Sequence, residues 1–238
     1  YIVISILYFV SGATMLLVSK RGTVQHADEP KHVFADMLDG LRYVWQHPPV
    51  FALIMLSIVP FLFGMPLNTL LPAFNEDILL GGPDDLGLLL SAMGIGAIAG
   101  SLMLAASGEM KRKGFWLIST CIAWGVATSA FGMSSSLVMA VVTLAVVGWL
   151  SSWNMSLNRG MLQLQVEQKM RGRIMSIDMM SHGLMPLGVL PISVVADTYD
   201  VGVALVVSGL IFVVLIAGLL AASRAVRQVD SPLASASS

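Results

Sequence analysis

Long apolar runs separated by polar connections dominate the pattern along this chain. A helix that crosses the hydrocarbon core of a bilayer needs about 20 mostly apolar residues. Seven stretches approach or exceed that length: Tyr1–Val18, Val50–Phe74, Leu86–Ser107, Phe115–Gly132, Leu137–Leu157, Ile174–Val195 and Val201–Ala222. Because lipid gives backbone amides no hydrogen-bond partner, each run must satisfy its own backbone as a helix. The pattern therefore predicts an all-α, polytopic transmembrane bundle.

Lys and Arg occupy only every second connection between these spans. All 13 of them follow the first, third, fifth or seventh predicted span. The other connections hold no basic residue, and their charges are Glu76, Asp77, Asp84, Asp85, Asp197 and Asp200. Cytoplasmic loops collect Lys and Arg. We therefore expect the first span to run inward, the C-terminus to be cytoplasmic, and the inner or plasma membrane of the cell to hold the chain.

The connection between the first two spans, residues 19–48, has a pattern of its own. Apolar residues recur at helical spacing on one side and polar residues take the other: Phe34, Met37, Leu38, Leu41 and Trp45 against Asp36, Asp39, Arg42 and Gln46. This predicts an amphipathic helix over 33–46 that lies on the inner face of the membrane; a regulatory docking role is the alternative. The expected domains are a helix of a preceding bundle (1–18), this cytoplasmic linker (19–48), a six-helix bundle (49–223) and a disordered cytoplasmic tail (224–238).

Composition argues against several classes of function. Hydrophobic residues make up 56 % of the chain and charged residues 11 %, whereas soluble domains carry about 25 % charged residues. The net charge of −1 predicts no nucleic-acid partner. The sequence has no P-loop, Gly-x-Ser-x-Gly or His-Glu-x-x-His motif, so we expect no enzymatic activity, no ATP-driven step, no cofactor and no metal.

Because the chain starts inside an apolar run without Met, we also expect a fragment that begins within a membrane helix.

Proline and glycine mark the second span as a candidate moving element. Pro60, Gly64 and Pro66 interrupt it, and each proline removes a backbone donor and bends a helix. Asn68 falls on the face of Pro60 and Gly64. We hypothesise that this helix bends during gating and that Asn68 faces a central cavity. The alternative is a hydrogen bond from Asn68 to a neighbouring helix, without contact to a substrate.

The fifth span carries a polar stripe. Ser151, Asn154 and Asn158 recur at i, i+3 and i+7 on an otherwise apolar helix. Polar residues in a membrane face protein or water rather than lipid. We therefore interpret this stripe as the lining of a substrate cavity.

The sixth span holds an acid and a histidine at i and i+4, Asp178 and His182. Side chains at that spacing can meet on a helix and pass a proton between them. We hypothesise that they couple transport to protons, and that His182 also lines the cavity. For Asp178 itself the favoured interpretation is a place near the inner interface, where it pairs with Arg171, Arg173 or Lys111.

Small residues predict where helices approach each other. Gly94, Gly96 and Gly100 on the third span let a neighbouring backbone come close, so we expect them to serve packing. The fourth and seventh spans, Phe115–Gly132 and Val201–Ala222, carry few polar residues, and we expect both to face lipid.

Several segments resemble the second half of a major facilitator superfamily transporter, in which the first span would be the sixth of twelve. Gly94–Gly100 followed by Gly108–Gly114 is similar to the family's glycine-and-basic loop motif, with Glu109 as the candidate substitute for its aspartate. Asp39–Val44 is similar to the linker before the seventh helix in the drug and siderophore exporter branch. Three further segments resemble the tenth-to-eleventh helix region of enterobactin-exporter-like members: Gly148–Ser152, Met161–Val166 and Arg171–Met175.

The resemblance implies a function and partners. It implies a bundle of two three-helix repeats, and proton-coupled antiport that moves a small organic molecule outward by alternating access. The implied partners are that substrate, protons, membrane lipids and the N-terminal half of the same protein. The basic loops would latch one bundle against the other, besides meeting anionic lipids; their residues are Gly108, Glu109, Lys111, Arg112, Lys113, Arg171 and Arg173. A membrane-embedded enzyme and a receptor or scaffold without transport remain as alternatives.

Overall fold

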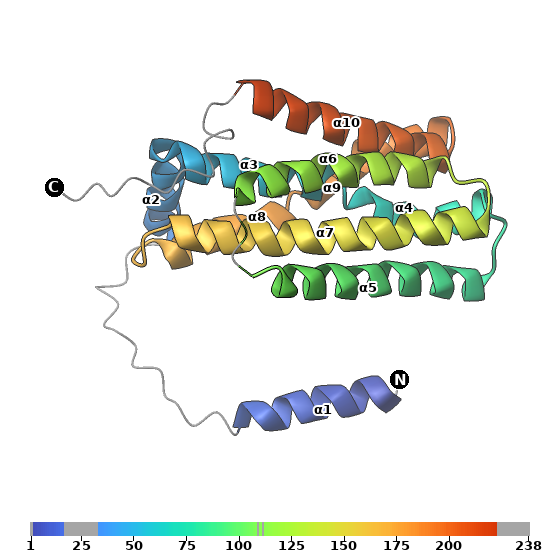
Figure 1. Ribbon diagram of the computed structural model, residues 1–238, viewed down its shortest axis with the longest axis horizontal. Coiled ribbons are helices and arrows are strands. Elements are labelled where there is room, and N and C mark those ends of the chain that lie inside the picture. The colour runs from blue at the N-terminus through green and yellow to red at the C-terminus, as the bar shows by residue number, and fades with distance from the viewer. Residues whose placement is uncertain (1, 17–32, 109, 111, 223–238) are drawn as a thin grey trace. The chain divides into compact units, whose positions relative to one another are not determined.

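The computed structural model describes residues 2–16, 33–108, 110 and 112–222, and these residues are almost entirely helical (Figure 1). No strand occurs among them. The helices are α1 (Ile2–Leu16), α2 (Val33–Gln46), α3 (Pro48–Phe63), α4 (Pro66–Asp77), α5 (Pro83–Ala106), α6 (Lys113–Gly132), α7 (Leu137–Gln165), α8 (Arg171–His182), α9 (Met185–Thr198) and α10 (Val201–Ala222). The predicted all-α fold is confirmed.

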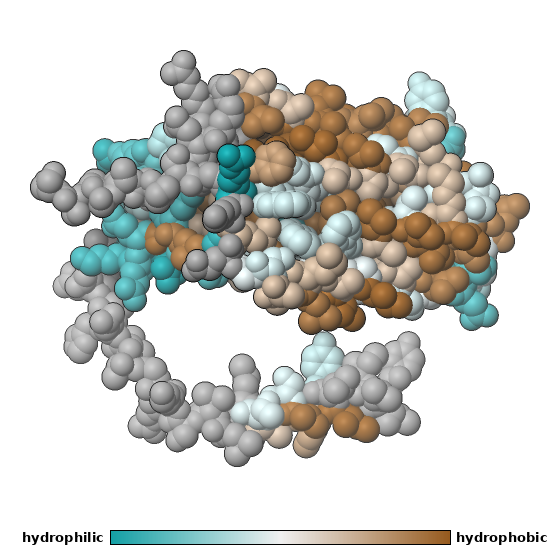
Figure 2. All heavy atoms as spheres, in the orientation of Figure 1, coloured by the Kyte–Doolittle hydropathy of each residue, from teal (hydrophilic) through white to brown (hydrophobic). Residues whose placement is uncertain are grey.

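The chain forms two units, Tyr1–Asp36 and Met37–Ser238. In the first unit α1 is a helix of 15 apolar and small residues. The described part of the second unit contains six helical stretches that are long and apolar enough to cross a membrane: α3 with α4, α5, α6, α7, α8 with α9, and α10. Apolar residues cover the middle of this bundle and hydrophilic ones gather at its ends (Figure 2). These stretches match the second to seventh predicted spans.

Two of the six spans are broken near their middles. Between α3 and α4 the backbone N–H groups of Gly64 and Met65 both donate to the carbonyl oxygen of Pro60, at 2.7 and 3.1 Å. The break falls where the prolines predict it. The second break, at Gly183 and Leu184 between α8 and α9, was missed, because Ile174–Val195 was taken as one helix.

The broken helices pack against each other. A Cβ atom on Gly188 of α9 would overlap the backbone of Leu62 on α3. Glycine is therefore required where these two spans approach, and each break lies within a few residues of this contact. Both discontinuous helices consequently meet at a close backbone contact near their breaks.

The fourth span lies inside the bundle, and the prediction that it faces lipid is wrong. Helix α6 packs between α7 and α10, and 61 % of its most apolar stretch is buried, against 22 % for α5. Gly125 and Gly132 of α6 face the α10 backbone, where added Cβ atoms would meet Gly209 and Gly202. A scarcity of polar residues was read as lipid exposure, but small residues make the same sequence suitable for close helix contact.

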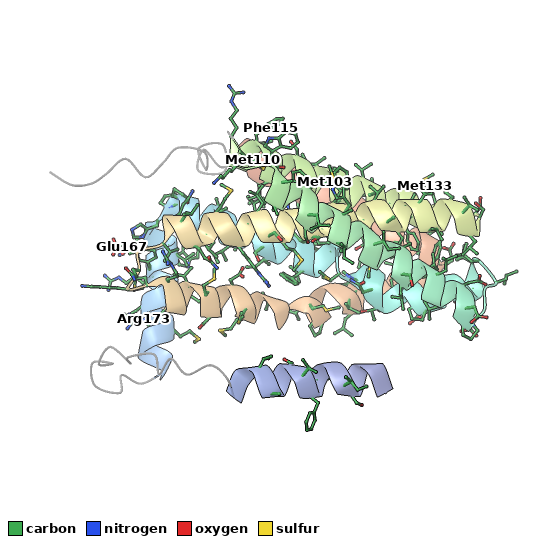
Figure 3. All side chains as sticks on the ribbon, turned by 60° about the horizontal axis from the view of Figure 1, so that its bottom comes forward. Met103, Met110, Phe115, Met133, Glu167 and Arg173 are labelled. Carbon is green, nitrogen blue, oxygen red and sulfur yellow. The ribbon has the colours of Figure 1, made fainter. Side chains whose placement is uncertain are left out.

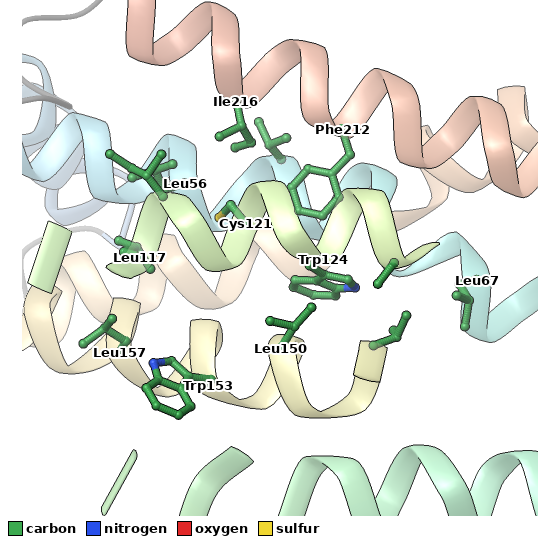
Figure 4. Packing of buried hydrophobic residues seen from close by; sticks show 14 of the residues in the cluster. Leu56, Leu67, Leu117, Cys121, Trp124, Leu150, Trp153, Leu157, Phe212 and Ile216 are labelled. Atoms are coloured by element: carbon green, nitrogen blue, oxygen red, sulfur yellow. The ribbon is translucent and has the colours of Figure 1, made fainter. Parts of the chain in front are cut away.

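Buried aromatic rings fill the space on both sides of α6 (Figure 4). Trp124 lies beside Leu150 of α7, and Phe212 of α10 stands edge-on to the Trp124 ring with centroids 5.5 Å apart. Edge-to-face packing is the favoured arrangement of such rings. Trp124 is 1 % exposed, so it is a fixed part of the interior.

Helices α5 and α7 pack backbone to backbone through glycine. Added Cβ atoms on Gly96 and Gly100 would overlap the carbonyl groups of Ala145 and Trp149, and one on Gly148 would overlap that of Met93. Gly94 does not share this role, which corrects the expectation for that residue. Nothing lies within 4 Å of its added Cβ, because positions i and i+2 lie on opposite sides of a helix.

Helix α2 coincides with the amphipathic helix predicted over 33–46 and, from Met37 onward, belongs to the second unit. Gly40 is buried, with Ile177 and Arg173 of α8 against it. Arg173 also forms an ion pair with Asp39 at 3.6 Å. Arg173 and Glu167 lie at this end of the bundle, and Met133 lies toward the other (Figure 3).

Candidate functional site

A buried carboxylate links three helices in the interior of the bundle. Asp178 of α8 is 2 % exposed. Its Oδ1 accepts a hydrogen bond from the hydroxyl of Ser57 on α3, at 2.6 Å. Its Oδ2 lies 3.9 Å from Nε of Arg159 on α7, whose side chain is 45 % exposed. An ionised carboxylate in this position therefore has a hydrogen-bond donor and a cation beside it.

The partners of Asp178 differ from those expected. The sequence suggested Arg171, Arg173 or Lys111, but Arg173 pairs with Asp39 and Lys111 lies outside the described residues. Arg159 forms the ion pair with Asp178 instead, because α7 continues to Gln165. The predicted end of that span was Leu157. Arg159 was thus assigned to a loop when it stands on the helix.

Other residues proposed from the sequence lie at the ends of the bundle or outside the described set. Glu109 and the side chain of His182 lie outside the described part of the structure. Gly108 and Arg112 both have left-handed backbones, with φ of +60° and +58°. Both lie between α5 and α6, and Lys113 begins α6. Arg171 begins α8 and is exposed.

A small cavity of about 10 Å³ lies beside the Ser57–Asp178–Arg159 group, which is enough room for one water molecule. Its lining includes Ser57, Trp124, Asn154, Asn158 and Arg159. Two buried polar atoms of this lining are Nε1 of Trp124 and Oδ1 of Asn158. Neither has a hydrogen-bond partner among the described residues. We call this space the inner cavity.

The polar stripe of α7 divides into different roles. The Asn154 side-chain nitrogen lies 3.0 Å from the Leu117 carbonyl oxygen, the Thr120 hydroxyl and the Cys121 sulfur, all on α6. The Asn158 nitrogen donates to the Leu53 carbonyl oxygen of α3 at 3.3 Å. Both residues therefore tie α7 to its neighbours, although they also border the inner cavity.

A larger cavity of about 200 Å³, which we call the outer cavity, lies on the α4 side of the first break. It is lined by Asn68, Gly94 and Ser151 together with apolar residues, so it brings these three sequence candidates together. Asn68 is exposed and its side-chain nitrogen contacts the sulfur of Met65, one turn away. Met65 and Trp124 border both cavities.

Three residues of the site were missed from the sequence: Ser57, Trp124 and Arg159. Ser57 had a usable signal, because it is the only polar residue between Pro48 and Phe63. Arg159 directly follows Asn158, so the polar stripe itself could have indicated that α7 continues. Trp124 had no usable signal in the sequence, since an indole in an apolar run is typical of an ordinary core.

Comparison with known proteins gives the family. The whole chain, residues 1–238, matches the family described as transmembrane secretion effector. The multidrug efflux pump Tap of Mycolicibacterium fortuitum is 26 % identical over 167 residues, 69 % of this chain and 40 % of that protein. The enterobactin exporter EntS of Escherichia coli O1:K1 / APEC is 28 % identical over 144 residues, which are 60 % of this chain and 34 % of that protein.

A third relative is the staphyloferrin A transporter of Staphylococcus aureus (strain NCTC 8325 / PS 47), 26 % identical over 144 residues, which are 58 % of this chain and 34 % of that one. This chain thus matches only 34–40 % of the length of these relatives. The relatives are transporters, and the resemblance drawn from the loop and linker segments is confirmed. The chain belongs to the transmembrane secretion effector family of the major facilitator superfamily.

Proposed function

We propose that the whole protein is a proton-coupled efflux transporter that moves a small organic molecule out of the cell by alternating access. The inner or plasma membrane would hold it with the C-terminus in the cytoplasm, and an N-terminal bundle of the same protein would complete the transport path. The names of the relatives support efflux. The observation that carries the proton coupling is the buried Asp178 held between Ser57 and Arg159, two residues that border the inner cavity.

Asp178 has the surroundings that a coupling carboxylate needs. The charged group that faces it from α7 is Arg159. Helix α3 carries no charged residue and contributes the Ser57 hydroxyl. On α2, Asp39 is paired with Arg173, toward the start of α8. Protonation of Asp178 would therefore cancel its charge attraction to Arg159.

Loss of this attraction would free α7 and α8 to move relative to each other. The breaks at Gly64–Met65 and Gly183–Leu184 supply the points at which α3–α4 and α8–α9 could bend. A ligand can shift such an equilibrium only by as much as it binds the two states differently. A proton on Asp178 meets this condition, because the ion pair exists in one protonation state only.

The outer cavity is the candidate place for part of the substrate. Asn68 of α4 and Ser151 of α7 offer polar groups in a mostly apolar lining, which is typical of small-molecule sites. Membrane carriers of this kind bind substrate near the middle of the bilayer at discontinuous helices. The first break, at Gly64 and Met65, borders this cavity.

The test compares Asp178→Asn with Asp197→Asn in the full-length protein. Asp197 is an exposed carboxylate on α9, so it controls for loss of a negative charge. Proteoliposomes with a trapped pH dye and ethidium or salicylate as probe report substrate and proton movement together. We expect Asp178→Asn to abolish proton movement coupled to the transported probe, and Asp197→Asn to leave it unchanged. Equal coupling in the wild type and both variants would contradict the proposal.

A further inference from the structure

We propose that the inner cavity is a site for one ordered water molecule, and that this water and the Ser57 hydroxyl relay protons from the outer cavity to Asp178. The inference rests on the proposed function, because it gives the proton path for the same carboxylate.

The lining offers one water molecule the partners that it needs. A buried water molecule makes about three hydrogen bonds to polar groups that are otherwise unsatisfied. The indole N–H of Trp124 can donate to it, and the amide oxygen of Asn158 can accept from it; both atoms are buried without a partner among the described residues. The Ser57 oxygen, which also borders the cavity, can accept the second proton of the water.

Ser57 already points its own proton at the carboxylate. Its hydroxyl donates to Oδ1 of Asp178 at 2.6 Å, and a hydroxyl can donate one hydrogen bond while it accepts others. The order is then water, Ser57 and Asp178, each group donating to the next. Arg159 lies beside the other oxygen of the carboxylate, Oδ2, so it does not block the contact between the Ser57 hydroxyl and Oδ1.

The proton transfer balances along this line. An excess proton that reaches the water passes to the Ser57 oxygen while the original Ser57 hydroxyl proton passes to Oδ1 of Asp178. One O–H bond breaks and one forms at Ser57, the water is neutral again, and the protonated Asp178 is the product. The reverse transfer releases the proton from Asp178.

Met65 and Trp124 stand between the two cavities, because each of them borders both. A flexible thioether side chain can move aside more readily than an indole ring that is packed on Phe212. The Met65 side chain is therefore the gate through which a proton carried by water passes from the outer to the inner cavity.

The first test measures the rate of ethidium-driven proton movement in proteoliposomes of the full-length protein. We expect Ser57→Ala, which removes the hydroxyl, to lower the rate at least about tenfold, a modest value for the loss of a positioned proton-transfer group. Ser57→Thr keeps a hydroxyl and should stay within about twofold of the wild type. Unchanged ethidium binding in each variant controls for folding. Equal rates in Ser57→Ala and the wild type, or equal losses in Ser57→Ala and Ser57→Thr, would overturn the relay.

The second test detects the water itself and does not depend on transport. X-ray radiolysis labels side chains that lie beside ordered internal water, with mass spectrometry as the readout. We expect labelling of the buried Trp124 in the wild type, and a loss of at least about half of it in Asn158→Leu, which removes one of the partners of the water. Absence of label on Trp124, or label that Asn158→Leu leaves unchanged, would overturn the water site. A wild type that is labelled but does not couple ethidium to protons would instead count against the proposed function.

Discussion

At the scale of single residues, similar side chains serve different purposes according to the neighbours that the fold gives them. Asn154 is 1 % exposed, and its amide nitrogen reaches three acceptors on α6. Asn68 is exposed, and among the bonds described it contacts only the sulfur atom of Met65, at the break before α4. Both were expected to line a cavity. Asn154 fixes α7 to α6, and Asn68 borders a space large enough for part of a ligand.

Asn154→Ala should therefore destabilise the protein more than Asn68→Ala does. Interhelical hydrogen bonds in membrane proteins contribute about 0.6 kcal/mol on average and at most about 1.7 kcal/mol, and the buried position adds a small cavity. We expect a loss of about 1–2 kcal/mol for Asn154→Ala and less than about 0.5 kcal/mol for Asn68→Ala. Thermal unfolding of the full-length protein in detergent measures both, and equal losses would contradict the assigned roles.

At the scale of helices, glycine decides which faces pack. Helix α5 shows the rule most clearly, because Gly96 lies against the carbonyl group of Ala145 while Gly94, two residues earlier, faces open space at the outer cavity. Lipid provides no hydrophobic drive for helix association, so the close approach of α5 and α7 rests on van der Waals contact between backbones, together with a hydrogen bond between the Ser101 and Ser152 hydroxyls at 2.7 Å.

Gly96→Ala and Gly94→Ala form a matched pair that tests this rule. The added methyl group at position 96 would overlap backbone atoms that cannot rotate away, so we expect a loss of about 1–3 kcal/mol. At position 94 the methyl group meets nothing within 4 Å, and the higher helix propensity of alanine predicts no loss or a small gain. Unfolding midpoints in the same detergent give the comparison; a larger loss at position 94 would refute the helix contact.

At the scale of the whole molecule, the spans could be predicted because their cause is local. A run of apolar residues must form a helix in lipid whatever its neighbours do, so six predicted spans recur in the bundle. The break at Gly64–Met65 could be anticipated from Pro60 and Pro66 for the same reason. The break at Gly183–Leu184 was missed although Pro186 and Pro191 follow it, because a proline within a membrane helix need not break it, as α9 shows by continuing past Pro191.

The site could be predicted only in part, because its contacts join residues distant in the sequence. Asp178 lies on a span where the sequence placed it, but its partners Ser57 and Arg159 come from α3 and α7. Arg159 was taken to end the fifth span at Leu157. A long cationic side chain can nevertheless stay on a membrane helix when a carboxylate lies within reach. Nothing in the local pattern reveals that α8 places such a carboxylate there.

The central claim is that Asp178 takes up and releases a proton within the bundle, and infrared difference spectroscopy tests it most directly. The full-length protein in lipid is exposed to alternating acidic and neutral buffer, and the carbonyl stretch of protonated carboxylic acids is recorded. We predict a band that Asp178→Asn removes and that Asp197→Asn retains. A band of the same size in Asp178→Asn would contradict the account, because the proton would then reside on another group.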